Sequence, residues 1–210
     1  MTEPLRVAFV TGTTPDKWAR AWRDQRRGPL ELVPVDEDDQ EAVVRRGDVD
    51  MALVRLPVDT EDLHCVRLYD EQPVVVAGRD HLVSVAETVT LADLDDEQLV
   101  RPHRSGWRPA AEQLAWPAMS EREAIETVAS GTGIVVVPMS VARLFQRKDV
   151  IRRDVTDLPS TTIALVWLRD RDDDTTQAFV GLVKGRTANS SRLGSRPCQP
   201  SLPRPPAGST

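Results

Sequence analysis

The stretch Gly47-Asp48-Val49-Asp50-Met51-Ala52-Leu53-Val54-Arg55 begins with a glycine that ends a helix and continues into an apolar run typical of a buried strand. Two earlier apolar runs, Leu5–Val10 and Leu30–Val35, have a similar strand length. The segment between those two runs has helical spacing, which places Trp18 and Trp22 on one helix face. Strands that alternate with helices in this way favour right-handed βαβ units and a parallel sheet.

The second half of the chain repeats this order of patterns without repeating the sequence. Strand-like runs occur at residues 73–77, 134–137 and 163–168, and Ser120-Glu121-Arg122-Glu123 is a capping box that opens a helix. A further helical pattern covers residues 176–183. The fold class predicted for the chain is therefore α/β, with mostly parallel sheets flanked by helices.

The charge distribution argues against a nucleic-acid-binding protein. The 210 residues carry a formal net charge of −6, but residues 185–210 hold four arginines and no acid. Residues 1–184 therefore carry 23 basic and 33 acidic side chains, a net charge of −10. Nucleic-acid binders depend on cationic side chains that neutralise phosphates, so we expect no direct nucleic-acid binding by this body. The acidic run Asp36–Asp39 indicates a solvated turn.

The two ends of the chain indicate where it acts and how far the folded part extends. Met1-Thr2-Glu3-Pro4 has no basic region followed by a long apolar one, and no apolar run approaches the roughly 20 residues that span a bilayer. We therefore expect a cytoplasmic protein without membrane contact. Residues 186–210 are rich in Pro, Arg and Ser and have no periodic apolar positions, which predicts a disordered tail.

No group of residues has the spacing of a catalytic or metal site. His64, His81 and His103 lie far apart in the sequence and have no metal-ligand spacing to acids or cysteines, so they fit surface or core histidines better. Ser105 lies near His103 but lacks the strand–turn–helix context of a nucleophile elbow. The sequence thus predicts that the protein is not an enzyme and uses no cofactor and no metal.

A few polar residues lie where a ligand could bind. Thr13 and Thr14 precede a helix start, where backbone N–H groups attract anions, although plain helix caps would look the same. Arg55 ends a predicted central strand and could pair with an anionic ligand, or with a neighbouring acid. Thr132, within Gly131-Thr132-Gly133, occupies a turn that is also typical of a helix end.

Taken in order, several stretches resemble the effector-binding (substrate-binding) domain of LysR-type transcriptional regulators. The likeness covers residues 5–183, the whole of the predicted folded part. Its most family-like stretch is Val128–Pro138, and Gly47–Arg55 matches the family's "G-x-x-D-[LMV]-A-[IL]" strand. The other stretches that carry the resemblance are Leu5–Phe9, Leu68–Val76, His81–Leu82 and Leu91–Leu94.

This resemblance implies the type 2 periplasmic-binding-protein fold, in which two α/β lobes enclose a cleft for a small effector, often an organic or aromatic acid. Lobe I would comprise residues 1–72 and 156–185, and lobe II residues 73–155. The residues implied to line the cleft are Thr13, Thr14, Arg55, Pro102, His103 and Thr132.

Two departures from the family pattern affect the functional interpretation. Full LysR-type regulators carry an amino-terminal winged helix-turn-helix, whereas this chain starts at the effector domain, so we expect it to have no DNA-binding domain of its own. Residues 102–119 also lack the helix expected there, since Trp107, Pro109, Trp116 and Pro117 interrupt the segment.

We therefore predict a cytoplasmic effector-binding module that forms a homodimer, or a heterodimer with related regulators. Trp18 and Trp22 would suit either the core or such a subunit contact. The alternatives are an interaction module that dimerises with full-length regulators and modulates them, an enzyme on the same fold, and a solute-binding protein of the transport type.

Overall fold

The structure, a computed structural model, describes residues 3–25 and 27–185 and divides them into two compact units. The described residues of the first unit lie within Met1–Val10, Thr14–Tyr69 and Thr162–Thr210, and those of the second within Thr11–Thr13 and Asp70–Thr161. The predicted disordered tail lies outside the described residues. Because compactness alone does not define a folding domain, the predicted lobe limits stay a prediction.

The first unit is built on a five-stranded sheet with the strand order β2-β1-β3-β9-β4. β1 pairs in parallel with both β2 and β3, which confirms the parallel arrangement predicted for the three amino-terminal strands. β3 pairs antiparallel with β9, which returns from the carboxyl-terminal part of the chain. The strands are β1 (Leu5–Val10), β2 (Leu30–Val35), β3 (Met51–Arg55), β4 (Leu63–Glu71) and β9 (Thr161–Leu168).

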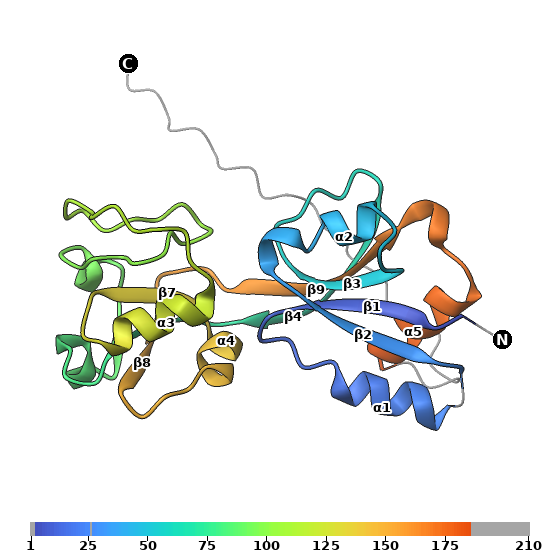
Figure 1. Cartoon of the computed structure of the whole chain (residues 1–210), viewed down its shortest axis with the longest axis horizontal. Coiled ribbons are helices and arrows are strands. Elements are labelled where there is room, and N and C mark those ends of the chain that lie inside the picture. The colour runs from blue at the N-terminus through green and yellow to red at the C-terminus, as the bar shows by residue number, and fades with distance from the viewer. Residues whose placement is uncertain (1–2, 26, 186–210) are drawn as a thin grey trace, which may run out of the picture. The chain divides into compact units, whose positions relative to one another are not determined.

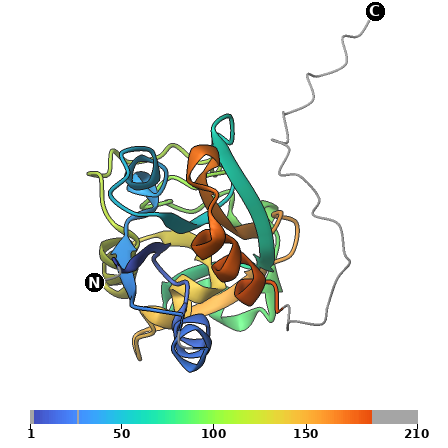
Figure 2. The same ribbon diagram turned by 90° about the vertical axis from the view of Figure 1, so that its right-hand side faces the viewer.

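Helices cover both faces of this sheet (Figure 2). Helices α1 (Asp16–Asp24) and α5 (Asp174–Val183) pack on one face, and α2 (Ala42–Arg45) packs on the other. Trp22 is 1% exposed and meets Phe179 of α5 edge-on, with ring centroids 5.7 Å apart. Trp18 is buried in the same cluster. Both tryptophans therefore belong to the core of this unit.

The starts of the two long helices differ in how they are capped. The N-cap of α1 is Pro15, whose carbonyl accepts from the N–H groups of Trp18 and Ala19, and no side chain caps this helix. The alternative interpretation of Thr14 as a plain helix cap is therefore wrong. The N-cap of α5 is Asp173, whose carboxylate accepts from the backbone N–H groups of Thr175 and Thr176.

The second unit is built on a four-stranded sheet with the order β6-β8-β5-β7. Its central strand β5 pairs antiparallel with both β7 and β8, and only the short β6 is parallel to β8. The predicted mostly parallel sheet is therefore wrong for this unit, because an apolar run identifies a buried strand without fixing its direction. The strands are β5 (Pro73–Gly78), β6 (Thr88–Val89), β7 (Ile134–Pro138) and β8 (Val150–Val155).

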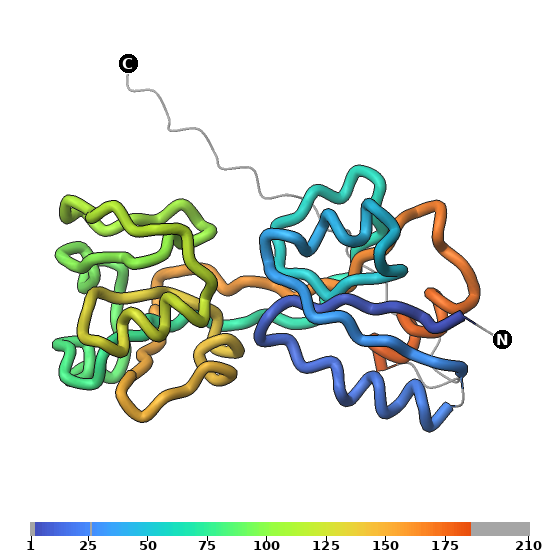
Figure 3. The backbone as a smooth tube through the Cα atoms, viewed as in Figure 1, coloured from blue at the N-terminus to red at the C-terminus, as the bar shows by residue number. Residues whose placement is uncertain are grey.

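Helices α3 (Glu121–Ala129) and α4 (Met139–Leu144) cover one face of this sheet, as the cartoon shows (Figure 1). The other face packs against the 3-10 helices η2 (Leu82–Val85) and η3 (Ala92–Leu94). Residues 101–120 run without helix or strand, so the segment in which the sequence lacks a helix is irregular (Figure 3). Within the described residues, no helix is long and apolar enough to cross a membrane.

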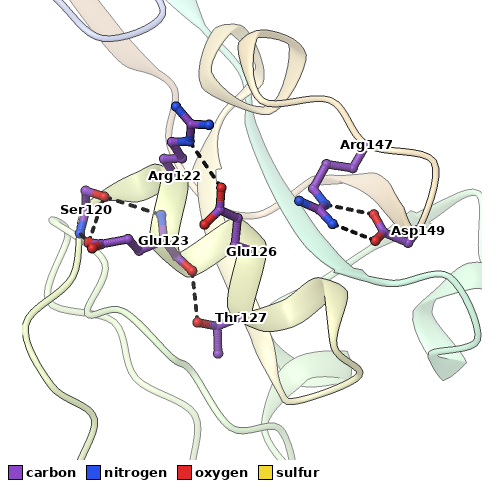
Figure 4. Close-up of polar contacts among 7 residues, drawn as sticks. All are labelled: Ser120, Arg122, Glu123, Glu126, Thr127, Arg147 and Asp149. Carbon is purple, nitrogen blue, oxygen red and sulfur yellow. Dashed lines mark hydrogen bonds and ion pairs between the residues drawn. The ribbon is translucent and has the colours of Figure 1, made fainter.

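The predicted capping box at the start of α3 is confirmed (Figure 4). Ser120 Oγ accepts from the Glu123 N–H at 3.3 Å, and Glu123 Oε2 accepts from the Ser120 N–H at 2.7 Å. The second bond favours the charged carboxylate, so it holds the pKa of Glu123 below its ordinary value.

We expect Trp22→Ala to lower the free energy of unfolding by about 3–5 kcal/mol, because it opens a cavity beneath α5. Urea denaturation followed by circular dichroism measures this change. The control is Leu114→Ala, since Leu114 is 63% exposed and its truncation should change stability by no more than about 0.5 kcal/mol. Equal effects of the two substitutions would contradict the core position of Trp22.

Candidate functional site

Arg55, predicted as an anion-binding residue, is buried at the end of β3 and is 1% exposed. Its Nη1 lies 2.7 Å from Oε2 of Glu37, which is also buried. Glu37 begins the 3-10 helix η1 (Glu37–Asp39), in the acidic run that the sequence indicates as a solvated turn. That prediction is wrong for Glu37, because its carboxylate turns inward to a guanidinium.

The side-chain amide of Gln40 forms hydrogen bonds with the backbone of β3 beyond the point where β1 stops pairing with it. β1 pairs with β3 only as far as Leu53, so the backbone of Arg55 has no strand partner on that side. There Gln40 Oε1 accepts from the Arg55 N–H at 2.8 Å, and Gln40 Nε2 donates to the Arg55 carbonyl at 3.0 Å. An amide with one donor and one acceptor end satisfies both backbone groups at once.

The sequence left two roles open for Arg55, a ligand contact or a partner of a nearby acid. The structure contains the second, since Arg55 and Glu37 form an ion pair. A buried ion pair positions the guanidinium firmly and neutralises much of its charge. The ligand contact stays a prediction.

Thr13 belongs to the second unit and is buried. Its neighbour Gly12 has φ +89° and approaches α4 so closely that a Cβ at this position would lie 2.6 Å from Ser140 Oγ. Among the described residues, neither Thr13 Oγ1 nor Ser140 Oγ has a hydrogen-bond partner, although both atoms are buried. Buried hydroxyls of this kind call for a partner such as a ligand or an ordered water.

The remaining predicted site residues are exposed or lie in loops. Thr14 is exposed at the start of α1 in the first unit. Pro102 and His103 follow Leu99 in the second unit, and His103 Nδ1 lies 2.8 Å from Ser105 Oγ and accepts from the Ser105 N–H at 3.2 Å. This local turn fixes the orientation of the imidazole ring.

Thr132 lies at the opposite end of β7 from Ser140. β7 begins at Ile134, which pairs with Ala77, and ends at Pro138, directly before α4. Thr132 is exposed and comes before Ile134, the first residue of β7. Its hydroxyl lies 3.2 Å from Ser130 Oγ. The rule that ligands bind beyond the carboxyl ends of parallel strands does not apply here, because Thr132 precedes its strand.

Sequence reasoning missed Glu37, Gln40 and Ser140. Gln40 and Glu37 lie in a polar stretch that gives no periodic signal of burial. Ser140 lies in the first turn of the short helix α4, where no local sequence pattern marks it as a site residue. His64 Nε2 lies 3.6 Å from Asp172 Oδ2, and His81 Nε2 lies 3.1 Å from Glu97 Oε2. Within the described part of the chain, no three His, Cys, Asp or Glu side chains are arranged to hold a metal ion.

The family of the chain follows from a comparison with protein families. A model of the LysR substrate binding domain matches residues 23–188. The chain belongs to the LysR substrate-binding domain family. The resemblance found in the sequence is confirmed.

Two curated relatives of this LysR domain are named as activators of gene expression. The Hca operon transcriptional activator HcaR of Escherichia coli K12 is 26% identical over 174 residues, which cover 76% of this chain and 58% of HcaR. A probable hydrogen peroxide-inducible genes activator of Mycobacterium avium is 28% identical over 208 residues, which cover 87% of this chain and 66% of the relative. The chain therefore spans less than two thirds of either relative.

Solved structures of LysR-type effector domains share the fold. The effector-binding domain of a BenM variant superposes with a TM-score of 0.73 at 18% identity, covering 88% of this chain and 94% of that domain. The reduced OxyR regulatory domain of Pseudomonas aeruginosa gives a TM-score of 0.68 at 19% identity. The superposition covers 87% of this chain and 96% of that domain. These matches confirm the predicted type 2 periplasmic-binding-protein fold.

We expect Glu37→Gln to lower the free energy of unfolding by about 3–5 kcal/mol, because it removes the charged carboxylate that lies 2.7 Å from the buried guanidinium of Arg55. Urea denaturation measures the loss. Glu126→Gln is the control, since Glu126 forms an exposed pair with Arg122 at 3.1 Å and exposed pairs contribute about 1 kcal/mol or less. If Glu37→Gln lowered the free energy of unfolding no more than Glu126→Gln, the buried pair would not stabilise the fold.

Proposed function

We propose that this LysR domain is a cytoplasmic effector-binding module that senses a small organic or aromatic acid, and that it is not an enzyme. Its partners in this proposal are the small molecule and a second regulator chain, in a homodimer or a heterodimer with related regulators. Membership of a family of regulatory domains supports the proposal, as do relatives that are named transcriptional activators.

The observation that carries the proposal is the pair of buried hydroxyls, at Thr13 and Ser140, without partners among the described residues. A hydroxyl can both donate to a carboxylate and accept from a ligand N–H or O–H group. Leaving such a group unpaired in a buried position costs about 1–3 kcal/mol, and a bound ligand would recover this cost. Gly12 allows the close approach of this segment to α4, since any Cβ would collide with Ser140 Oγ.

The other proposed ligand residues are those the sequence predicts. In the second unit these are Pro102 and His103, and in the first unit Thr14 and Arg55. Thr14 precedes α1, whose first N–H groups and positive dipole end favour an anion. Thr132 contributes least to this proposal, because β7 separates it from Ser140.

We expect a carboxylate effector to raise the melting temperature of the protein, since a ligand that binds only the folded state stabilises it by mass action. Differential scanning fluorimetry with a panel of aromatic and aliphatic carboxylates, each beside its neutral primary amide, tests this. Stabilisation by an acid but not by its amide supports the proposal. If no carboxylate in the panel stabilises the protein, the interaction module becomes the better interpretation.

With a stabilising acid in hand, Thr13→Val should weaken its binding by about 1 kcal/mol, because the substitution removes one hydrogen bond and keeps the shape of the side chain. Isothermal titration calorimetry measures the affinity. The stability of the variant without ligand should not fall, since the lost hydroxyl has no described partner. Thr127→Val is the control, because its hydroxyl only donates to the Glu123 carbonyl within α3. Unchanged affinity of Thr13→Val would move the site elsewhere.

We also propose that residues 1–184 do not bind nucleic acid directly, because they carry a net charge of −10. In fluorescence anisotropy at physiological salt, a labelled duplex should show no saturable binding to the purified chain. Sequence-specific binding that weakens as salt is raised would contradict this.

A further inference from the structure

The second unit contains a hollow of about 260 Å³ between α4 and β8 that the proposed effector residues do not use. Three arginines line it, Arg147, Arg152 and Arg153, and no acidic residue does. Its apolar wall includes Val76, Ala142 and Val150. The hollow is somewhat smaller than the pockets that hold drug-sized ligands, so it suits a smaller molecule.

The register of the sheet turns Arg152 toward this hollow. Arg152 of β8 is paired with Val76 of β5 in an antiparallel ladder, and directly paired residues project from the same face. Val76 and Ala142 belong to the apolar cluster beneath α3 and α4, so this is the face that α4 covers. The guanidinium of Arg152 therefore lies beside an apolar surface.

The guanidinium groups of Arg147 and Arg153 already donate hydrogen bonds within the protein. Arg147 donates from Nε and Nη2 to the two carboxylate oxygens of Asp149, both at 2.8 Å (Figure 4). These bonds hold the pKa of Asp149 below its ordinary value, so the pair stays charged at neutral pH. Arg153 donates to the backbone carbonyls of Ser84 and Ala86 on the opposite side of the strand.

Arg152 differs from both neighbours. Within residues 3–25 and 27–185, its half-buried guanidinium takes part in no hydrogen bond and no ion pair, so its donor fork is available. The chain segment 143–153 contains five basic side chains and one acid, although the body of the chain is acidic. Two acids, Glu87 and Asp154, line a second hollow that Arg152 also borders, whereas none lines this one. This local excess of positive charge attracts anions to the hollow.

We propose that this hollow binds a small carboxylate whose apolar body rests on Val76, Ala142 and Val150. Its carboxylate would accept a bidentate pair of hydrogen bonds from Arg152, the geometry that a guanidinium fork favours. This site is separate from Thr13 and Ser140, which serve the proposed effector. Its volume of about 260 Å³ suits a free small molecule.

Titration of the uniformly ¹⁵N-labelled full chain with benzoate, followed by ¹H–¹⁵N correlation spectra, tests the proposal. Saturable shifts of the amides of residues 146–147 and 150–153, which line the hollow, are expected with benzoate and not with benzamide, its neutral match. Arg152→Gln should weaken benzoate binding at this site at least about tenfold, since a hydrogen-bonded charge pair is lost. Arg122→Gln removes an exposed arginine on α3 and should leave the affinity unchanged.

Spectra of each variant without benzoate show whether it folds, and Arg152→Lys is the second variant should the glutamine disrupt the fold. Lysine keeps the charge without the planar fork, so binding weakens but persists. Equal binding of benzoate and benzamide, or equal affinity in Arg152→Gln and the wild type, would overturn the proposal. Shifts confined to the amides around Thr13 and Ser140 would also overturn it, while supporting the proposed effector site.

Discussion

A buried ion pair at the end of β3 fixes the central strand of the first unit. Arg55 and Glu37 neutralise one another there, and Gln40 supplies the backbone partners that β1 no longer provides. All three residues must be buried together, because any one of them alone would place an unsatisfied polar group in the core. The chain between β2 and α2 is therefore folded against β3 by polar contacts, whereas the sheet faces are held by apolar side chains.

Apolar periodicity predicted most of the sheet strands, because those elements bury regular side chains. The capping box from Ser120 to Glu123 predicted the start of α3. Periodicity missed β8, whose sequence Val150-Ile151-Arg152-Arg153-Asp154-Val155 places arginines on both faces. Strand direction in the second unit could not be predicted either, since it depends on which strands become neighbours after the chain has crossed between the units. The acid Asp173, which caps α5, lies in a charge run that resembles any exposed turn.

The candidate site was predictable only in part, and for a similar reason. Thr13 follows a strand that sequence reasoning places with ease, so its position near a helix start could be inferred. The approach of Gly12 to Ser140 joins residues more than 120 positions apart, and no local pattern encodes such a contact. For Arg55, the strand was predictable but the ion-pair partner was not, because Glu37 lies in an acidic run that looks solvated in the sequence.

Arg153 has a consequence for the motions of the second unit. Its guanidinium donates to the carbonyls of Ser84 and Ala86, on either side of the exposed Val85, while Val83 is buried in the apolar cluster. One side chain of β8 therefore ties down the turn that leads into β6. Segments that are joined by such contacts open together, with one shared free energy of local unfolding. The η2 turn should exchange its amide hydrogens as a single unit with the edge of β8, instead of fraying one residue at a time.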